Sequence, residues 1–303
     1  SYSVHGTTML PFYIYYSMFG FQRVGDLIWA AADQRARGFL IGATAGRTTL
    51  GGEGLQHQDG SSHVVAATVP NCRAYDPAFA GELAVVLDHG ARAMVERGED
   101  VFYYVTVMNE NYEQPSLPAG AAPDVVKGMY RFAVRDVAGA GATVALLGAG
   151  AIMRETIAAA ELLAAWNVRS EIYSVTSYSE LARDASETER WNRLHPTAPP
   201  RCSHVATLLA GTLPVIAASD YVRAHAQTIA PFVAGRFVAL GTDGFGRSDT
   251  RAVLRRFFEV DRQHIAVAAL QALALDGAVP ARIVAEALDA YGIDVDAMPS
   301  WSR

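Results

Sequence analysis

The spacing of hydrophobic residues changes along the first third of the chain, and each change predicts a different element. From Tyr16 to Ala31 the apolar residues recur at helical spacing, which predicts an amphipathic helix. Shorter apolar runs follow, as is typical of buried strands. The strands expected in this region are 39–41, 72–75 and 101–107, and a helix is expected at 78–97.

The composition changes between Asn109 and Asp124, where prolines and a glycine cluster with little apolar content. Such a segment predicts a domain linker. Beyond it we expect strands at 143–147, 171–176, 215–218 and 237–241, and helices at 152–166 and 179–194. Alternating strands and helices imply parallel sheets covered by helices on both faces. The pattern therefore predicts an α/β fold with two tandem parallel-sheet domains, 1–116 and 117–303.

Composition supports a folded protein with two cores. The chain has 303 residues, of which 51% are hydrophobic and 18% are charged, the opposite of the balance that disorder requires. The net charge of −6, without a basic run, gives no reason to expect nucleic acid or an acidic membrane surface as a partner.

No segment reaches the roughly 18 apolar residues of a membrane span, and there is no signal-peptide pattern. The only two cysteines, Cys72 and Cys202, lack metal-type spacing and suit a reducing compartment. We therefore expect a cytoplasmic protein without a membrane partner. Cys72 lies in an apolar run, where most cysteines are inert.

The loop from Ala45 to His63 is the most informative segment. It places two imidazoles and two carboxylates, those of Glu53, His57, Asp59 and His63, within eleven residues. Histidine exchanges protons near neutral pH, and a neighbouring carboxylate can hold its tautomer, so the group suits chemistry on a carbonyl. A polar surface loop is the alternative interpretation. The residue types also fit zinc or iron, but they match no recognised ligand spacing, and no metal site is predicted.

Two glycine-rich turns have structural interpretations. At Gly148–Gly150, a dinucleotide-binding fingerprint would need a third glycine where Met153 stands. A tight strand-to-helix turn is the favoured interpretation, and a nicotinamide oxidoreductase is kept as an alternative class. At 241–249 we also expect a structural turn, with Ser248 capping a helix that begins near Thr250.

Aromatic residues crowd the expected first helix. They are Phe12, Tyr13, Tyr15, Tyr16, Phe19 and Phe21. Most such clusters belong to a core, but one or two of these rings could form a stacking wall for a flat heteroaromatic ring. Composition does not decide between the two interpretations.

The aromatic run 11–23, the segment 36–42 and the loop closely resemble the homodimeric type of pyruvate dehydrogenase first component. That component is the thiamine diphosphate-dependent decarboxylase of its complex. The resemblance continues, in order, through 108–112, 173–177, 180–184 and 241–249. It covers the family's last third and implies a transketolase-like fold. Residues 1–116 would be most of the pyrimidine-binding domain, and 117–303 the transketolase-like carboxy-terminal domain.

The resemblance also implies roles for the loop and the aromatic run. Tyr16 and Phe19 would pack around the cofactor's aminopyrimidine. His57 and Glu53 resemble the family's substrate-side residues, near the cofactor's reactive C2 atom. Asp59 and His63 match the Asp-Gly-x-x-His stretch shared with transketolases, where it faces the sugar substrate.

Other parts of the family's site precede Ser1 in the family's pattern. These are the motif that binds the diphosphate and Mg²⁺ and the glutamate that protonates the aminopyrimidine. The resemblance thus implies either a leader segment outside the sequence given or a complementary subunit that carries the diphosphate-binding domain with Mg²⁺. In the second case we expect an α2β2-type assembly and no activity from this chain alone.

Three loop positions depart from the family. It usually has Asn, Glu and His where this chain has Gly51, Gln58 and Ser61, which removes a charge and an imidazole beside the substrate and puts strict pyruvate specificity in doubt. A diverged role is one hypothesis: transfer of a two-carbon unit from a 2-oxo acid or a ketose phosphate to a lipoyl or acyl-carrier domain. A non-catalytic assembly subunit with the same fold is the alternative.

Overall fold

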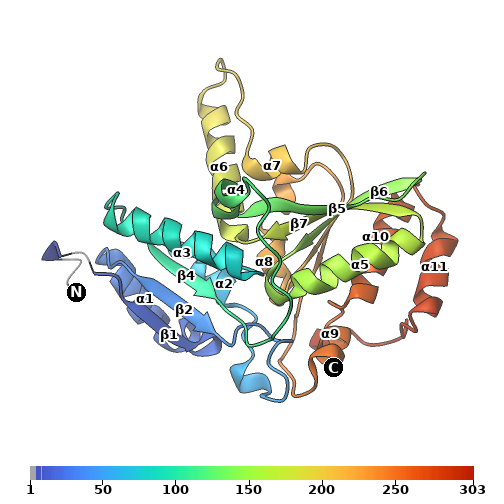
Figure 1. The fold of residues 1–303 in the computed structure, drawn as a ribbon, viewed down its shortest axis with the longest axis horizontal. Helices are drawn as coiled ribbons and strands as arrows, with labels where there is room; N and C mark the ends of the chain where they lie inside the picture. Colours follow the sequence, from blue (N-terminus) through green and yellow to red (C-terminus); the bar gives the residue numbers. More distant parts are fainter. Residues whose placement is uncertain (1–4, 8) are drawn as a thin grey trace.

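The computed structural model of the chain describes residues 5–7 and 9–303, and it contains two β-sheets that lie side by side (Figure 1). The first sheet has the order β1-β2-β4-β3, and all its strands are parallel. Its strands are β1 (Phe12–Tyr16), β2 (Phe39–Ala43), β3 (Cys72–Tyr75) and β4 (Phe102–Thr106). Its helices are α1 (Phe21–Asp33), α2 (Ser62–Ala66) and α3 (Ala80–Val95).

The second sheet has the order β5-β7-β6-β8-β9 and is parallel except for β5, which pairs with β7 in the antiparallel direction. Its strands are β5 (Met129–Arg135), β6 (Ala142–Gly148), β7 (Val168–Val175), β8 (Val215–Ala218) and β9 (Phe237–Leu240). The helices of this half are α4 (Ala122–Lys127), α5 (Met153–Ala165), α6 (Tyr178–Leu194), α7 (His204–Leu208), α8 (Arg223–Gln227), α9 (Arg251–Phe257), α10 (Arg262–Leu275) and α11 (Ala281–Ala290).

Each sheet is buried on both faces. In the second sheet, one face packs on α5, α10 and α11, and the other packs on α6, α7 and α8. In the first sheet, α3 covers one face, while α1 and α2 cover the other. The predicted α/β architecture with two tandem sheets is therefore confirmed. The boundary at residue 116 stays a prediction.

Side-chain caps begin several helices where the sequence supplies them. Ser177 accepts a hydrogen bond from the Glu180 N–H at the start of α6, and Asp261 accepts one from the His264 N–H at the start of α10. Gly128 ends α4 in the left-handed conformation, with a φ of 106°. Among the described residues, no helix is long and apolar enough to span a bilayer.

Two predictions about elements are wrong. Tyr16 does not begin a helix but ends strand β1, and the first α-helix starts only at Phe21. Aromatic residues are common in strands, and their incidental helical spacing hid this one. The antiparallel strand β5 was not predicted, because arginines interrupt its apolar pattern at Arg131 and Arg135.

Candidate active site

The loop that carries the predicted site residues leaves the end of β2 through a sharp change of direction. Thr44 has a φ of 50°, a conformation that a β-branched residue rarely adopts. At Gly46, with a φ of 85°, a Cβ atom would lie 2.1 Å from Asp220 Oδ2. Only glycine fits there, and it lets the loop pass directly against the second domain.

His57 meets the aromatic residues of the amino-terminal run at the far end of this loop. The centroid of its ring lies 5.2 Å from that of Tyr16 and 5.4 Å from that of Phe19, whose own centroids are 5.9 Å apart. Tyr16 ends β1, Phe19 lies in the 3-10 helix η2 (Ser17–Phe19), and His57 lies in η3 (Leu55–His57). Three predicted site residues therefore converge on one surface, where Tyr16 is 43% exposed.

Glu53 lies beside this aromatic cluster. Its Oε2 atom is 3.2 Å from His57 Nδ1, and the two side chains are 42% and 22% exposed. The pair has no hydrogen-bond geometry, since His57 Nδ1 is without a hydrogen-bond partner among the described residues. The contact is thus a loose electrostatic one that leaves the imidazole room to reorient.

Asp59 is fully buried, although it lies only two residues beyond His57. Its Oδ1 atom accepts hydrogen bonds from the N–H groups of Ser61 (3.1 Å) and Ser62 (3.0 Å), and its Oδ2 atom accepts one from the Ser17 hydroxyl. Both carboxylate oxygens therefore organise the start of α2 and tie it to η2. Substrate contact by Asp59 stays a prediction.

His63 is buried between the two domains. Its Nε2 atom lies 3.0 Å from Thr106 Oγ1, and that hydroxyl donates to Asp76 Oδ1 at 2.6 Å, so it accepts from the imidazole. The His63 ring also stacks on that of His225 from the second domain, with 4.9 Å between centroids. Burial lowers the pKa of His63 to about 3, and burial likewise lowers the pKa of His225. Its predicted substrate role is untested.

Asp76 was not singled out from the sequence, yet it lies at the centre of this buried region. Burial raises its pKa to about 7, and its Oδ2 atom has no hydrogen-bond partner among the described residues. A Cβ atom at Gly150 would lie 2.4 Å from Asp76 Oδ2, and one at Gly148 would lie 2.7 Å from Thr156 Oγ1. Close packing therefore accounts for both glycines of that turn. A carboxylate directly after the buried strand β3 was the available signal.

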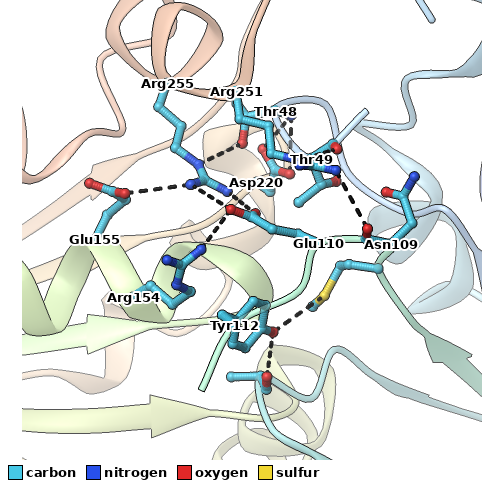
Figure 2. A network of polar contacts seen from close by, with 12 residues as sticks. Thr48, Thr49, Asn109, Glu110, Tyr112, Arg154, Glu155, Asp220, Arg251 and Arg255 are labelled. Atoms are coloured by element: carbon cyan, nitrogen blue, oxygen red, sulfur yellow. Dashed lines mark hydrogen bonds and ion pairs between the residues drawn. The ribbon is translucent and has the colours of Figure 1, made fainter. Parts of the chain in front are cut away.

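A network of charged residues anchors the start of the loop to the second domain (Figure 2). Arg255 is its centre and contacts Glu110, Glu155 and, through Nε at 3.3 Å, Thr48 Oγ1. Arg154 lies 2.6 Å from Glu110. Buried ion pairs of this kind are costly to break, because one partner is left as an uncompensated charge. The sequence did not reveal this network, whose members are far apart along the chain.

Further contacts fix the same loop. Asp220 accepts hydrogen bonds from the Thr48 N–H at 2.9 and 3.1 Å, and burial raises its pKa to about 6. Arg251 Nε donates to the Thr49 carbonyl at 2.8 Å, and Arg47 donates to the carbonyls of Thr242 and Gly244. The second domain therefore shapes the loop that presents His57.

The departures from the family differ in exposure. Gln58 is buried and hydrogen-bonds to backbone groups, Ser61 is half-buried, and Gly51 is exposed. The predicted cap at Ser248 is wrong. Thr250 caps α9 by accepting from the Val253 N–H, whereas Ser248 donates to the Gly52 carbonyl.

Two further observations concern a possible thiol nucleophile and a possible metal site. Cys72 is buried, and burial raises its pKa to about 12, which leaves little thiolate at neutral pH. Within the described ranges, no group of three or more His, Cys, Asp or Glu residues could hold a metal ion.

The chain is similar to known proteins over most of its length. Residues 1–115 match the family described as pyruvate dehydrogenase E1 component middle domain, and residues 128–261 match the transketolase-like carboxy-terminal domain. The pyruvate dehydrogenase E1 component of Cupriavidus necator is 60% identical over 296 residues, 97% of this chain and 33% of that protein. The chain thus matches a part of the pyruvate dehydrogenase E1 component. The resemblance seen in the motifs is thereby confirmed.

The chain is similar to only a part of these family members. The E1 component of Escherichia coli K12 is 50% identical over 299 residues, 98% of this chain and 33% of that protein, so the chain spans about a third of its relatives' length. Transketolase from Leishmania mexicana shares the fold, with a TM-score of 0.66 at 17% identity over 90% of this chain and 36% of that one. A structure described as split gene transketolase, inactive beta4 tetramer, has a TM-score of 0.60 at 14% identity, covering 88% of this chain and 77% of that one.

Proposed function

We propose that this chain forms the pyrimidine-side and substrate-side half of a thiamine diphosphate-dependent active site. The enzyme would transfer a two-carbon unit from a 2-oxo acid or a ketose phosphate to a lipoyl or acyl-carrier domain. The observation that carries the proposal is the meeting of Tyr16, Phe19 and His57 on one partly exposed surface. Similarity to a part of the pyruvate dehydrogenase E1 component supports the cofactor and the reaction class.

The described residues fit one end of the cofactor and not the other. Aromatic rings such as those of Tyr16 and Phe19 suit a flat heteroaromatic ring, and half-exposed rings leave it room. A diphosphate with Mg²⁺ needs carboxylate and amide oxygens, and the described residues contain no group of three or more His, Cys, Asp or Glu that could hold a metal ion. We therefore assign the diphosphate and Mg²⁺ to a polypeptide segment outside the described residues, either a leader segment or a complementary subunit.

His57 would handle the proton at the oxygen of the substrate carbonyl. The cofactor, when bound, supplies the site that accepts the electrons of the broken carbon–carbon bond. Glu53, 3.2 Å from His57 Nδ1, would offset the positive charge on the imidazole while it carries the substrate's proton. Asp59 would act indirectly, because its bonds to Ser17 and Ser62 fix both sides of the aromatic cluster.

An unpaired sheet edge supports the need for a complementary polypeptide. Among the strands that the structure describes, β1 pairs with β2 alone, and it exposes Phe12, Tyr13 and Ile14. A cavity of about 320 Å³ lies between this strand and α1, lined by Tyr13, Leu27 and other apolar residues. Exposed apolar strand edges are uncommon in isolated domains and typical of interfaces. We propose an α2β2-type assembly in the cytoplasm, the second chain covering this edge.

Reconstitution with the complementary polypeptide tests the proposal. The assembly should bind thiamine diphosphate and Mg²⁺ in calorimetry and convert pyruvate or a ketose phosphate when a lipoyl or acyl-carrier domain is present. Product analysis with each donor identifies the substrate class. If the complementary polypeptide alone binds the cofactor and turns over equally well, this chain is a non-catalytic assembly subunit and the proposal is wrong.

A further inference from the structure

Gln58, the residue directly after His57, connects the loop to the second domain through its side-chain amide. Its Oε1 atom accepts a hydrogen bond from the Arg247 N–H at 2.7 Å. Its Nε2 atom donates to the Arg247 carbonyl at 2.7 Å and to the Leu50 carbonyl at 3.2 Å. We call these three bonds the Gln58 clasp. The side chain is buried, so water does not compete for them.

The backbone around the Gln58 clasp is built for close approach. A Cβ atom at Gly246 would lie 2.5 Å from Gln58 Oε1 and 3.2 Å from Leu55 Cα, so the turn packs directly on η3. The Arg247 guanidinium lies 4.2 Å from the centroid of the Phe257 ring, which leaves the backbone of Arg247 to face Gln58. The turn at 244–249 thus supports the segment that presents His57.

The clasp requires an amide. An amide both donates and accepts hydrogen bonds, whereas an ionised carboxylate only accepts. An ionised glutamate at 58 would keep the bond from the Arg247 N–H but would set negative oxygen against the carbonyls of Arg247 and Leu50. Buried acceptors that face each other without a donor cost free energy.

We propose that Gln58 is a positioning residue for His57: the Gln58 clasp fixes η3 on the second domain and holds the imidazole against Tyr16 and Phe19 at any proton concentration. The effect on turnover rests on the proposed function, whereas the effect on loop order does not. The substitution Gln58→Glu makes the clasp depend on a proton, because only the protonated side chain can donate.

The first measurement is hydrogen–deuterium exchange by mass spectrometry on the full chain assembled with its complementary polypeptide. Peptides covering 54–59 and 245–249 are compared with wild type at the same pH. We expect Gln58→Glu to exchange roughly tenfold faster than wild type at pH 9 and much closer to it at pH 5.5. Gln58→Met, which lacks all three bonds, should exchange faster at both pH values. The control is Gln56→Glu, the same charge change at an exposed position of the same loop.

The second measurement is the pH profile of turnover for the same assemblies. The turnover of Gln58→Glu relative to wild type should fall about tenfold as the pH rises from 5.5 to 9. The turnover of Gln58→Met should be lower than that of wild type by a constant factor across the range. If Gln58→Glu does not fold at pH 9, Gln58→Met and Gly246→Ala carry the test.

Three results overturn this inference. One is wild-type exchange in Gln58→Glu at pH 9. The second is the same loss of protection in Gln56→Glu. The third is a result in which hydrogen exchange changes as expected but Gln58→Met turns over at least as fast as Gln56→Glu. If the variants show the expected exchange pattern but the wild-type assembly converts no two-carbon donor, the proposed function is wrong. The inference about the Gln58 clasp then still holds.

Discussion

His57 and His63 lie six residues apart on one loop, yet the fold gives them opposite environments. The His57 side chain is 22% exposed and lies beside Tyr16 and Phe19, with the exposed Glu53 3.2 Å from its Nδ1 atom. His63 is sealed between the domains, bonded to Thr106, and its low pKa of about 3 keeps it neutral. A residue that exchanges protons with a substrate needs access to it. We therefore propose that His57 carries out the loop's proton chemistry, whereas His63 packs between the domains.

The largest expected effect comes from removing His57. In the assembled enzyme, His57→Ala should lower turnover by about 10²–10⁴, or about 3–5 kcal/mol in activation free energy, because positioned proton transfer is lost. Its unfolding free energy should fall by about 1 kcal/mol, since the partly exposed ring loses its packing on Tyr16 and Phe19. Steady-state kinetics and urea unfolding measure the two quantities.

The partly exposed His89 on α3, away from the site, offers a matched control. His89→Ala should leave turnover near that of wild type. The contrast between the two loop histidines breaks down if His57→Ala keeps full activity, or if it destabilises the chain as much as His63→Ala does.

Replacing the buried Asp59 tests how much the buried part of the loop contributes to stability. Asp59→Ala should lower the unfolding free energy by about 2–4 kcal/mol, because the Ser17 hydroxyl and the Ser61 and Ser62 N–H groups lose a buried acceptor. Urea unfolding measures this change. Asp59→Asn should cost less, because one carbonyl oxygen can still accept from the N–H groups. Equal stability of Asp59→Ala and wild type would show that the buried bonds do not support the fold.

The secondary structure was predictable where one pattern dominated. The buried strands at 72–75 and 215–218 occur with the predicted bounds, and the second of them is an uninterrupted apolar run. β1 was misread because Tyr16, its last residue, falls at helical spacing from Phe19, and β5 was missed because its arginines interrupt the apolar pattern. Both strands lie at sheet edges, where the burial that creates a clear pattern is weakest.

The proximity of three predicted site residues followed from the sequence, but their surroundings did not. The motif resemblance brought Tyr16, Phe19 and His57 together, and the structure places them in contact. It gave no sign that Asp59 is fully buried, or that Asp76 lies behind His63. Those facts depend on residues far away in sequence, such as Ser17 for Asp59 and Thr106 for Asp76, so no local pattern predicts them.

The Asp76 carboxyl gives the sealed region a distinctive pH dependence. Burial raises its pKa from 3.8 to about 7, so the folded chain keeps a proton that the unfolded chain loses. Its contribution to stability is present at low pH and is lost as the pH rises from about 4 to 7, at about 1.4 kcal/mol per pH unit. Burial of His63 acts in the opposite direction below pH 6.5.

Replacing this carboxyl isolates its effect. The stability of Asp76→Asn relative to wild type should rise between pH 5 and 7 and level off above, because the amide does not titrate. Urea unfolding at several pH values measures the difference, with the exposed Asp26→Asn on α1 as control. A constant difference across this range would mean that Asp76 is ionised in the folded chain.

The smallest expected effect concerns the partly exposed aromatic cluster of Tyr16, Phe19 and His57. Tyr16→Leu keeps an apolar side chain but removes the ring that packs against His57 and Phe19. Because such ring contacts contribute about 0.5–1.5 kcal/mol, we expect thiamine diphosphate affinity in the assembly to fall by roughly two- to tenfold, with little change in unfolding free energy. Tyr13→Leu on the same exposed strand, whose side chain points to the opposite face, is the control for strand packing. An equal loss of affinity in both variants would trace the effect to β1 as a docking edge and not to the ring beside His57.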